Sequence, residues 1–381
     1  MLVGTLLAAE RVLREKVRQI DPATVRRVLV LEYRLPLGCL VHMTPVFEAI
    51  RRSRPEIEVA VATRGLGLQV LRHSKFVDRL IETPDPTADI VGAVRGLRRA
   101  LKAHSFHPDC ALTGASDQRT RIALMALLGA DGWRGGYTLK PALYQRPLAY
   151  DNRLSLIRNN LRLAKLAACE VEVTRPSVFF SEQDAATAKA LLREANPDGR
   201  PLIVFVTQNS GGQSTGWHTD RFVRVIDNAA RVHGCAVVYV GTAAEAPAIE
   251  AIRQAAGGVG TSIAGKTTVS ELAAVLAASD FMVTLDAGTM HVGRAAGVPM
   301  VVLGPSWQNP VEWLPLGVEN VRILRGPDRV GVPQGYRLDE ISAESVIAAL
   351  GEVIDLYPAT AAARELRLQT GVSKIDHLAS K

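Results

Sequence analysis

The sequence is poor in cysteine, and the few cysteines lie far apart. Only four of its 381 residues are cysteine, namely Cys39, Cys110, Cys169 and Cys235, and no two of them are close in sequence. This spacing excludes the usual zinc-binding motifs and a dense framework of disulfides. We therefore expect a protein of the reducing cytoplasm.

Long hydrophobic runs are also lacking. No apolar stretch approaches the roughly 20 residues that a helix needs to cross a bilayer. The first nine residues carry no basic leader and run directly into Glu10 and Arg11. We predict neither a signal peptide nor a transmembrane helix.

No tract of one charge sign dominates the chain. Lys and Arg number 45 against 38 Asp and Glu, a formal net charge of +7, and the cations are spread along the sequence. Such a balance favours anionic partners such as phosphates or acidic lipid surfaces, and we expect no nucleic-acid partner. Residues 2–20 form a predicted basic amphipathic helix with Arg11, Arg14, Lys16 and Arg18. Packing on its own domain is the favoured interpretation, and peripheral contact with an anionic membrane is the alternative.

The chain is rich in short apolar runs that alternate with helical patterns. Its length suits two domains, and 48% hydrophobic with 22% charged residues is typical of globular proteins. In the first half the predicted strands are 27–31, 57–62, 77–81 and 109–112, and the predicted helices are 44–52, 66–72, 87–103, 118–128 and 155–168. In the second half the predicted strands are 202–206, 236–240, 281–285 and 300–303, and the predicted helices are 220–232, 246–256, 269–278, 290–296 and 342–356.

This alternation predicts an α/β protein with two doubly wound parallel sheets. The Pro- and Gly-containing segment 196–201 puts a domain boundary between residues 170 and 200. We expect a first Rossmann-like domain over 1–180, a second over 181–355, and a tail, 356–381, that returns to the first domain. In open α/β sheets ligands bind outside the carboxyl ends of the strands, so a cleft between those edges is the expected site.

The most informative motif follows the strand 281–285. It contains Asp286, Gly288, Thr289, Met290 and His291. A strand that ends in an acid, a small-residue turn and a helix amino end together suit a bound diphosphate. Asp286 is expected to cap the helix, and His291 to donate to a phosphate or a sugar hydroxyl. A capping Asp and a packed His without any ligand remain the alternative.

A second anion site is predicted just after the strand 202–206. The loop 210–215 joins a strand to a helix and is rich in glycine and hydroxyl groups, with Ser210, Gly211, Gly212 and Thr215 as the candidate ligands. Successive amides in such a loop form a nest for phosphate oxygens.

The order Asp286, small residue, Gly288, any residue, Met290, His291, followed by Ala-Ala, Gly-Val-Pro and Gly-Pro, resembles the nucleotide-sugar motif of the heptosyltransferases, glycosyltransferase family 9. Further segments follow in the family's order: Leu37-Gly38 to Thr44-Pro45, Trp217 to Arg221-Phe222, and Ala264-Gly265-Lys266-Thr267-Thr268 with Glu271-Leu272. The likeness covers residues 26–350.

The resemblance implies the GT-B architecture, in which two Rossmann-like domains face a central cleft, with the donor on the second domain and the acceptor on the first. It places Asp286, Gly288 and His291 at the donor diphosphate and sugar. It places Gly265, Lys266 and Thr267 beside the nucleotide. The first-domain loop of Leu37, Gly38 and Cys39 corresponds to the family's catalytic loop.

Two positions depart from the family pattern. The family usually has an Asp as catalytic base after the Leu-Gly of the first loop, where this chain has Cys39, and a Lys two residues before Trp217, where it has Thr215. A thiol is a poor substitute for a carboxylate as a base. Glu32, at the end of the first strand, and Asp117, in the loop after another strand, are therefore the candidate bases, with His42 a third. For Glu32, pairing with Arg34 or Arg27 is an equally good interpretation.

The leading hypothesis is inverting transfer of a sugar, heptose being one candidate, from a nucleotide diphosphate sugar to a glycan or glycolipid acceptor such as a lipopolysaccharide core. A degenerate nucleotide-sugar-binding scaffold is the alternative, and an epimerase is a third. No two histidines have the spacing of a metal-binding helix, so we expect no metal and no cofactor. The expected location is the cytoplasm, with peripheral contact at the inner face of the cell membrane.

Overall fold

The computed structural model describes residues 21–34, 36–209, 216–332 and 334–379. Its chain divides into two compact units. Unit 1 comprises Met1–Leu35, His42–Pro176 and His377–Lys381, and unit 2 comprises Pro36–Val41 and Ser177–Asp376. The basic helix predicted over 2–20 lies outside the described residues.

Unit 1 contains a parallel sheet with the strand order β3-β2-β1-β4-β5-β6. Its strands are β1 Arg27–Leu31, β2 Glu58–Thr63, β3 Arg79–Glu82, β4 Cys110–Thr113, β5 Trp133–Gly136 and β6 Arg146–Pro147. The central strand β1 is an apolar run without alternation, as a strand covered on both faces requires. Val30 pairs in register with Val61 of β2 and with Leu112 of β4.

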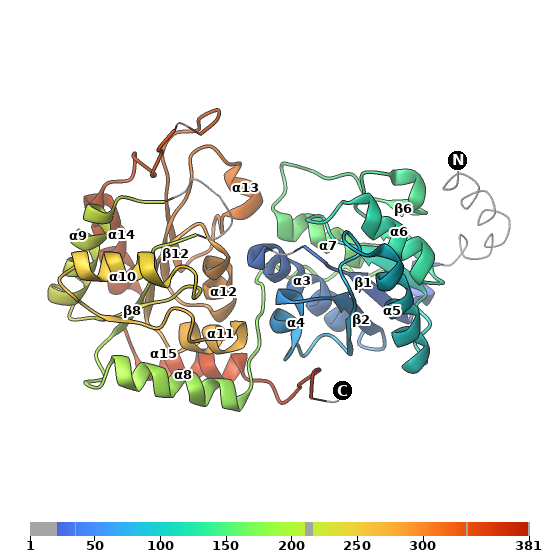
Figure 1. Ribbon diagram of the computed structural model, residues 1–381, viewed down its shortest axis with the longest axis horizontal. Coiled ribbons are helices and arrows are strands. Elements are labelled where there is room, and N and C mark those ends of the chain that lie inside the picture. The colour runs from blue at the N-terminus through green and yellow to red at the C-terminus, as the bar shows by residue number, and fades with distance from the viewer. Residues whose placement is uncertain (1–20, 35, 210–215, 333, 380–381) are drawn as a thin grey trace. The chain divides into compact units, whose positions relative to one another are not determined.

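The helices of unit 1 cover both faces of this sheet, with α5 and α6 on one side and α3, α4 and α7 on the other (Figure 1). They are α3 Leu37–Ser53, α4 Leu66–Leu71, α5 Ile90–Ala103, α6 Thr120–Gly129 and α7 Leu156–Leu166, with short 3-10 turns at η1 Pro22–Thr24 and η2 Pro141–Leu143. The prediction for α3 began seven residues too late, at 44, because a proline is normally tolerated only in the first helical turn. Here Pro45 lies inside the helix.

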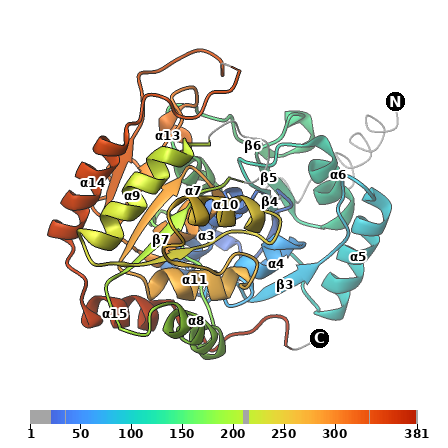
Figure 2. The same cartoon turned by 60° about the vertical axis from the view of Figure 1, so that its left-hand side comes forward.

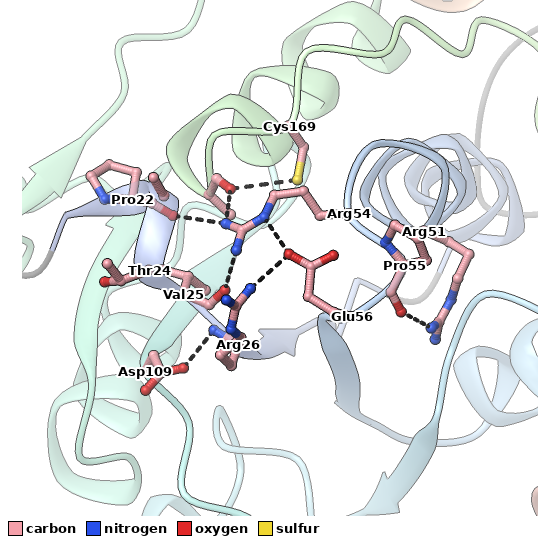
Figure 3. A network of polar contacts seen from close by, with 12 residues as sticks. Pro22, Thr24, Val25, Arg26, Arg51, Arg54, Pro55, Glu56, Asp109 and Cys169 are labelled. Carbon is pink, nitrogen blue, oxygen red and sulfur yellow. Dashed lines mark hydrogen bonds and ion pairs between the residues drawn. The ribbon is translucent and has the colours of Figure 1, made fainter.

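Arg54 links several chain segments at the amino-terminal edge of the unit 1 sheet (Figure 3). Arg54 donates to the carbonyls of Pro22 at 3.0 Å, Val25 at 2.9 Å and Ala167 at 3.3 Å, and it pairs with Glu56 at 3.0 Å. A single guanidinium, with its five fixed donors, thus holds the start of the unit to α3 and to the end of α7. This edge is the opposite end of the strands from Glu32.

Unit 2 repeats the architecture with the strand order β12-β11-β10-β7-β8-β9. Its strands are β7 Leu202–Val206, β8 Ala236–Tyr239, β9 Thr261–Ser262, β10 Phe281–Leu285, β11 Met300–Leu303 and β12 Val321–Leu324. Every residue of β7 and β10 is buried. Thr284 of β10 pairs with Val206 of β7 and with Val302 of β11.

Two layers of helices enclose the unit 2 sheet. They are α8 Glu182–Ala195, α9 Thr219–Arg231, α10 Ala246–Ala255, α11 Val269–Ala277, α12 Gly288–Ala296, α13 Pro310–Trp313, α14 Ala343–Leu356 and α15 Ala361–Gly371. Helices α9, α10 and α14 pack together over one face, and α8, α11, α12 and α15 over the other (Figure 2). Within the described residues no single helix is long and apolar enough to cross a bilayer, and α14 with α15 reaches that length only across a bend of 89°.

The predicted α/β class with two doubly wound parallel sheets is confirmed. All eight predicted strands are present, while β5, β6, β9 and β12 were not predicted because they are short or partly polar. Helices α8, α13 and α15 were also missed. Beyond α15 the chain reaches unit 1, where the His377 amide donates to the Arg72 carbonyl at 3.0 Å.

Candidate functional site

Two of the three candidate bases lie at neighbouring strand ends of unit 1. Glu32 directly follows β1, and Asp117 lies in the loop after β4. Strands β1 and β4 are parallel neighbours, so their carboxyl ends meet at one edge of the sheet. Both carboxyl groups are 1% exposed. The two acids are equally buried, but they have different hydrogen-bond partners.

The two carboxyl oxygens of Glu32 differ in their hydrogen bonds. Its Oε1 accepts from the Arg34 amide at 3.1 Å, whereas Oε2 is buried and has no hydrogen-bond partner within the described part of the chain. A Cβ on Gly114 would lie 2.9 Å from Oε2, so a larger residue there would force the carboxyl to move. Burial, and next the charge of Asp117, raise the pKa of Glu32 to about 8. Glu32 is therefore mostly protonated at neutral pH, and above about pH 8 its carboxylate is a stronger base than an ordinary glutamate.

Asp117 is engaged by Arg119. The guanidinium holds both carboxylate oxygens, Nε to Oδ1 at 2.6 Å and Nη2 to Oδ2 at 2.7 Å. Arg119 also donates to the Tyr33 carbonyl at 3.3 Å and to Thr87 Oγ1 at 3.4 Å. Arg119 therefore holds the Asp117 carboxylate in one orientation beside Glu32 and occupies both of its oxygens.

A buried amide ties the third candidate, His42, to the same edge. Asn160 on α7 accepts from the Ala115 amide at 2.8 Å and donates to the His42 carbonyl at 3.2 Å. A Cβ on Gly114 would lie 3.5 Å from the Asn160 Oδ1 and 2.9 Å from the Glu32 Oε2, so both side chains face this glycine. The His42 side chain is 1% exposed. Asn160 therefore fixes the loop after β4 against helix α3, and it was not predicted because no motif marks it.

The first-domain loop predicted from the sequence is the first turn of α3. Leu37, Gly38 and Cys39 belong to that helix, and the Cys39 amide donates to the Pro36 carbonyl at 3.0 Å. Cys39 is 4% exposed. These residues pack with unit 2, where a Cβ on Gly38 would lie 2.5 Å from Cδ2 of His291. The structure thus brings this turn together with one predicted donor residue.

The predicted donor motif spans the end of β10 and the start of α12. The residue at the amino cap is Ala287, without a side-chain hydrogen bond, so the expected cap by Asp286 is wrong. Asp286 directly follows β10, and its amide donates to the Leu303 carbonyl of β11 at 3.1 Å. Its carboxyl is 5% exposed, and burial raises its pKa to about 6.

His291 lies in the first turns of α12 and is neutral. Burial, and next the charge of Arg294, lower the pKa of His291 to about 3. A neutral imidazole still donates through one ring nitrogen. Gly288 begins the helix, and its missing side chain accommodates Leu37, because a Cβ there would lie 2.8 Å from the Leu37 Cβ. Thr289 is partly exposed, whereas Met290 is fully buried.

The predicted nucleotide loop follows β9, which lies three strands from β10 in the sheet. Gly265 has φ 74°, and a Cβ there would lie 2.8 Å from the Ala243 Cα, so two backbones meet closely at this point. Its amide donates to the Gly241 carbonyl after β8 at 2.9 Å. Lys266 is exposed and Thr267 partly exposed. The other predicted anion ligands, Ser210, Gly211, Gly212 and Thr215, lie outside the described residues.

Three further polar groups at this edge of unit 2 were not among the predicted site residues. Thr207 Oγ1, Asn209 Nδ2 and Trp307 Nε1 are buried, and within the described ranges none has a hydrogen-bond partner. Thr207 and Asn209 follow β7, and Trp307 follows β11, on the two sides of the β10 strand that carries Asp286. Buried donors normally find a partner, so these groups suit a polar ligand. Polar residues directly after a predicted strand were the available indication.

No metal cluster accompanies these groups. Within the described ranges no three His, Cys, Asp or Glu side chains are arranged to hold a metal ion.

Two doubly wound sheets with polar side chains at their strand ends define a protein of the GT-B class of glycosyltransferase fold. The chain belongs to glycosyltransferase family 9 (heptosyltransferase), whose sequence profile matches residues 95–329, more than half of its length. No curated protein matches the chain.

Solved structures of similar fold include members of the same family. A family 9 glycosyl transferase from Veillonella parvula has a TM-score of 0.77 at 18% identity, covering 89% of this chain and 99% of that one. ADP-heptose lps heptosyltransferase II of E. coli has a TM-score of 0.72 at 20% identity, covering 87% and 100%. E. coli heptosyltransferase WaaC with ADP has a TM-score of 0.65 at 17% identity, covering 86% and 99%.

Proposed function

We propose that this chain is an inverting glycosyltransferase that moves a sugar from a nucleotide diphosphate sugar to a hydroxyl of a glycan or glycolipid acceptor. Family membership supports the reaction class. The observation that carries the proposal for this chain is the Glu32 carboxyl, buried at a strand end with one oxygen unpartnered and a pKa of about 8. Such a group replaces the missing family aspartate as the base.

The reaction is a single displacement. Glu32, in its carboxylate form, takes the proton of the acceptor hydroxyl, whose oxygen forms a bond to the anomeric carbon. The bond from that carbon to the diphosphate oxygen breaks, and the nucleoside diphosphate leaves with the electron pair. Attack opposite the leaving group inverts the anomeric configuration. The charge of Asp117 assists by keeping Glu32 basic.

Unit 2 is proposed to bind the donor. Amides at the start of α12 and the N–H of neutral His291 suit the departing diphosphate. Asp286 is less suited to a phosphate, because like charges repel, and we assign it to a hydroxyl of the sugar. The unpartnered groups of Thr207, Asn209 and Trp307 supply further polar contacts. ADP-heptose is the first donor to test, because it is the substrate named for the E. coli heptosyltransferase of similar fold.

The acceptor is proposed to bind unit 1, and a lipopolysaccharide core is one candidate. The reaction is proposed to need no metal. We place the enzyme in the cytoplasm, in peripheral contact with the inner face of the cell membrane, where a glycolipid acceptor is accessible.

A second candidate function is nucleotide-sugar binding without transfer. It is favoured by Cys39, which occupies the position of the family base yet is buried in the first turn of α3. In this case donor binding is retained and no acceptor is modified.

The experiment has two arms. The melting temperature is measured with ADP-, UDP-, GDP- and dTDP-sugars, since a ligand at about 100 times its Kd stabilises a fold by about 2.7 kcal/mol. The stabilising donor is then incubated with lipopolysaccharide-core acceptors, and released nucleoside diphosphate is measured with and without acceptor. Acceptor-dependent release supports the transferase. Stabilisation without release for any acceptor extract supports the binding protein, and no stabilisation by any sugar nucleotide contradicts both.

A further inference from the structure

Helix α5 carries an uninterrupted basic face on unit 1. Its outward residues are Arg95, Arg98, Arg99 and Lys102, all exposed. At 3.6 residues per turn these four fall within about a third of the helix circumference. The opposite side, with Ala93, Leu97 and Leu101, is buried in the core of the unit. Figures 1 and 2 both show α5 along the outside of unit 1.

The four cations of this α5 face are electrostatically uncompensated. None of their side chains makes a hydrogen bond or an ion pair with any described residue, and α5 itself contains no acid. Some exposed arginines elsewhere do have a partner, such as Arg231, which pairs with Asp227 on α9 at 2.5 Å. Four like charges held together on one helix face repel one another, so a partner of opposite charge is favoured there.

An apolar side chain extends the same face. Val91 lies one turn before Arg95, points to the same side of α5 and is 54% exposed. A phosphate backbone offers nothing to a valine, whereas the boundary between headgroups and acyl chains accepts cations and apolar side chains together. The combination favours a lipid surface over a nucleic acid.

We propose that the α5 face, Val91, Arg95, Arg98, Arg99 and Lys102, docks unit 1 onto an anionic lipid surface. Each cation near such a surface strengthens binding by about fivefold. The face lies on a helix separate from the residues assigned to chemistry. The inference rests on the membrane contact proposed above and gives it a site. Its failure is distinguishable from failure of the proposed reaction, because lipid binding is measured without donor or acceptor.

The first test compares vesicle binding of full-length variants. Wild type is expected to sediment with phosphatidylglycerol-containing vesicles and not with pure phosphatidylcholine. The combined variant Arg95→Gln, Arg98→Gln, Arg99→Gln and Lys102→Gln should bind more weakly by on the order of several hundredfold. The matched control is Lys189→Gln, Arg193→Gln, Arg337→Gln and Lys374→Gln, four exposed cations of unit 2, which lowers the net charge from +7 to the same +3. The control should bind as wild type.

Three outcomes overturn the proposal. One is equal loss in the α5 variant and its control, which would make binding an effect of net charge alone. A second is loss only when Arg11, Arg14, Lys16 and Arg18 are replaced by Gln, which would place binding at the amino terminus. The third is wild-type binding to RNA but not to the anionic vesicles.

The second test locates the contact. All four native cysteines are buried, so a cysteine introduced at an exposed position can be labelled selectively. An environment-sensitive fluorophore on Val91→Cys should shift to the blue on phosphatidylglycerol vesicles. The same label on Leu366→Cys, in unit 2 and 66% exposed, should not shift. A shift at 366 without one at 91 contradicts the assignment.

Discussion

At the scale of single residues, two carboxyl groups at one sheet edge differ because their partners differ. Asp117 has a bidentate arginine, and Glu32 has one amide and an unpartnered oxygen. Burial without a hydrogen-bonded counterion disfavours the charged carboxylate, and the pKa of Glu32 is raised to about 8. The same physics separates Asp286, whose pKa is raised to about 6, from the solvent-exposed acids of unit 2.

The first prediction follows from the raised pKa of Glu32. The kcat/KM of transfer should rise with pH and level off above about 8, because only the carboxylate accepts a proton. Glu32→Gln should lower kcat/KM by about 10² to 10⁴ and remove this rise. Cys39→Ala should stay near wild type. Asp117→Asn should move the rise to lower pH, because the charge that raises the pKa of Glu32 is lost. A full rate in Glu32→Gln would assign the base elsewhere, to Asp117, His42 or the acceptor.

A second prediction concerns Asp286. Its pKa is about 6 in the folded chain against 3.8 normally, so the free energy of unfolding should fall as pH rises from about 4 to 6 and stay low above that range. Asp286→Asn should therefore be more stable than wild type at pH 8, by up to about 3 kcal/mol at 1.4 kcal/mol per pKa unit, and equal to it near pH 4. Urea unfolding at both pH values measures this. Donor affinity of the variant should fall, and unchanged affinity would remove Asp286 from the site.

At the scale of elements, contacts between segments distant in sequence set the geometry. Asn160 on α7 joins the loop after β4 to α3, and Arg364 on α15 joins that helix to Asp280 before β10. Neither contact follows a motif or a local period. Each bond is formed by a side chain whose partner is more than forty residues away.

The third prediction tests Asn160 as a positioning residue. Asn160→Asp keeps the acceptor for the Ala115 amide, loses the donor to His42 and adds a negative charge beside Glu32. The rise of kcat/KM with pH should therefore move to higher pH. Asn159→Ala is the control, since Asn159 is equally buried but bonds to Asp151 and Leu154. It should cost stability, about 1–3 kcal/mol, and leave the pH profile in place.

The fourth prediction tests how α15 is attached. Arg364 donates to both oxygens of Asp280, at 2.8 and 2.7 Å, and the Asp280 side chain is 2% exposed. Arg364→Met should leave that carboxylate buried without its counterion and cost about 3–5 kcal/mol in denaturant unfolding. Arg224→Met removes an ion pair whose side chains are 55% and 64% exposed, and it should cost less than about 1 kcal/mol. Equal costs would mean that the pair does not hold α15.

At the scale of the whole molecule, the chain consists of two units with separate cores and separate polar edges. The groups assigned to charge neutralisation are helix amides, a neutral histidine and polar side chains. Among the described residues no cluster suits a metal. The proposed reaction assigns donor binding and proton transfer to these protein groups.

The fifth prediction follows from this arrangement. EDTA should leave the transfer rate unchanged, because in the proposed reaction helix amides and His291 bind the diphosphate. A matched reaction with added Mg²⁺ is the control. A rate that falls with EDTA and returns with Mg²⁺ or Mn²⁺ would show that a metal carries part of the leaving-group charge.

The sequence by itself determined the α/β class, the two doubly wound sheets and the family. These depend on apolar periods, on glycine turns and on the motif from Asp286 to His291, all of which are local along the chain. Glu32 and Asp117 were found in the same way, because polar residues at predicted strand ends are visible in a sequence.

Only the tertiary structure decided how those residues behave. The burial of Glu32 and the bidentate ion pair between Arg119 and Asp117 depend on loops and strands that folding brings together. The role of Asn160, the unpartnered groups of Thr207, Asn209 and Trp307, and the wrongly predicted cap at Asp286 have the same origin. Desolvation and hydrogen-bond partners are properties of three-dimensional surroundings, and no local pattern encodes them.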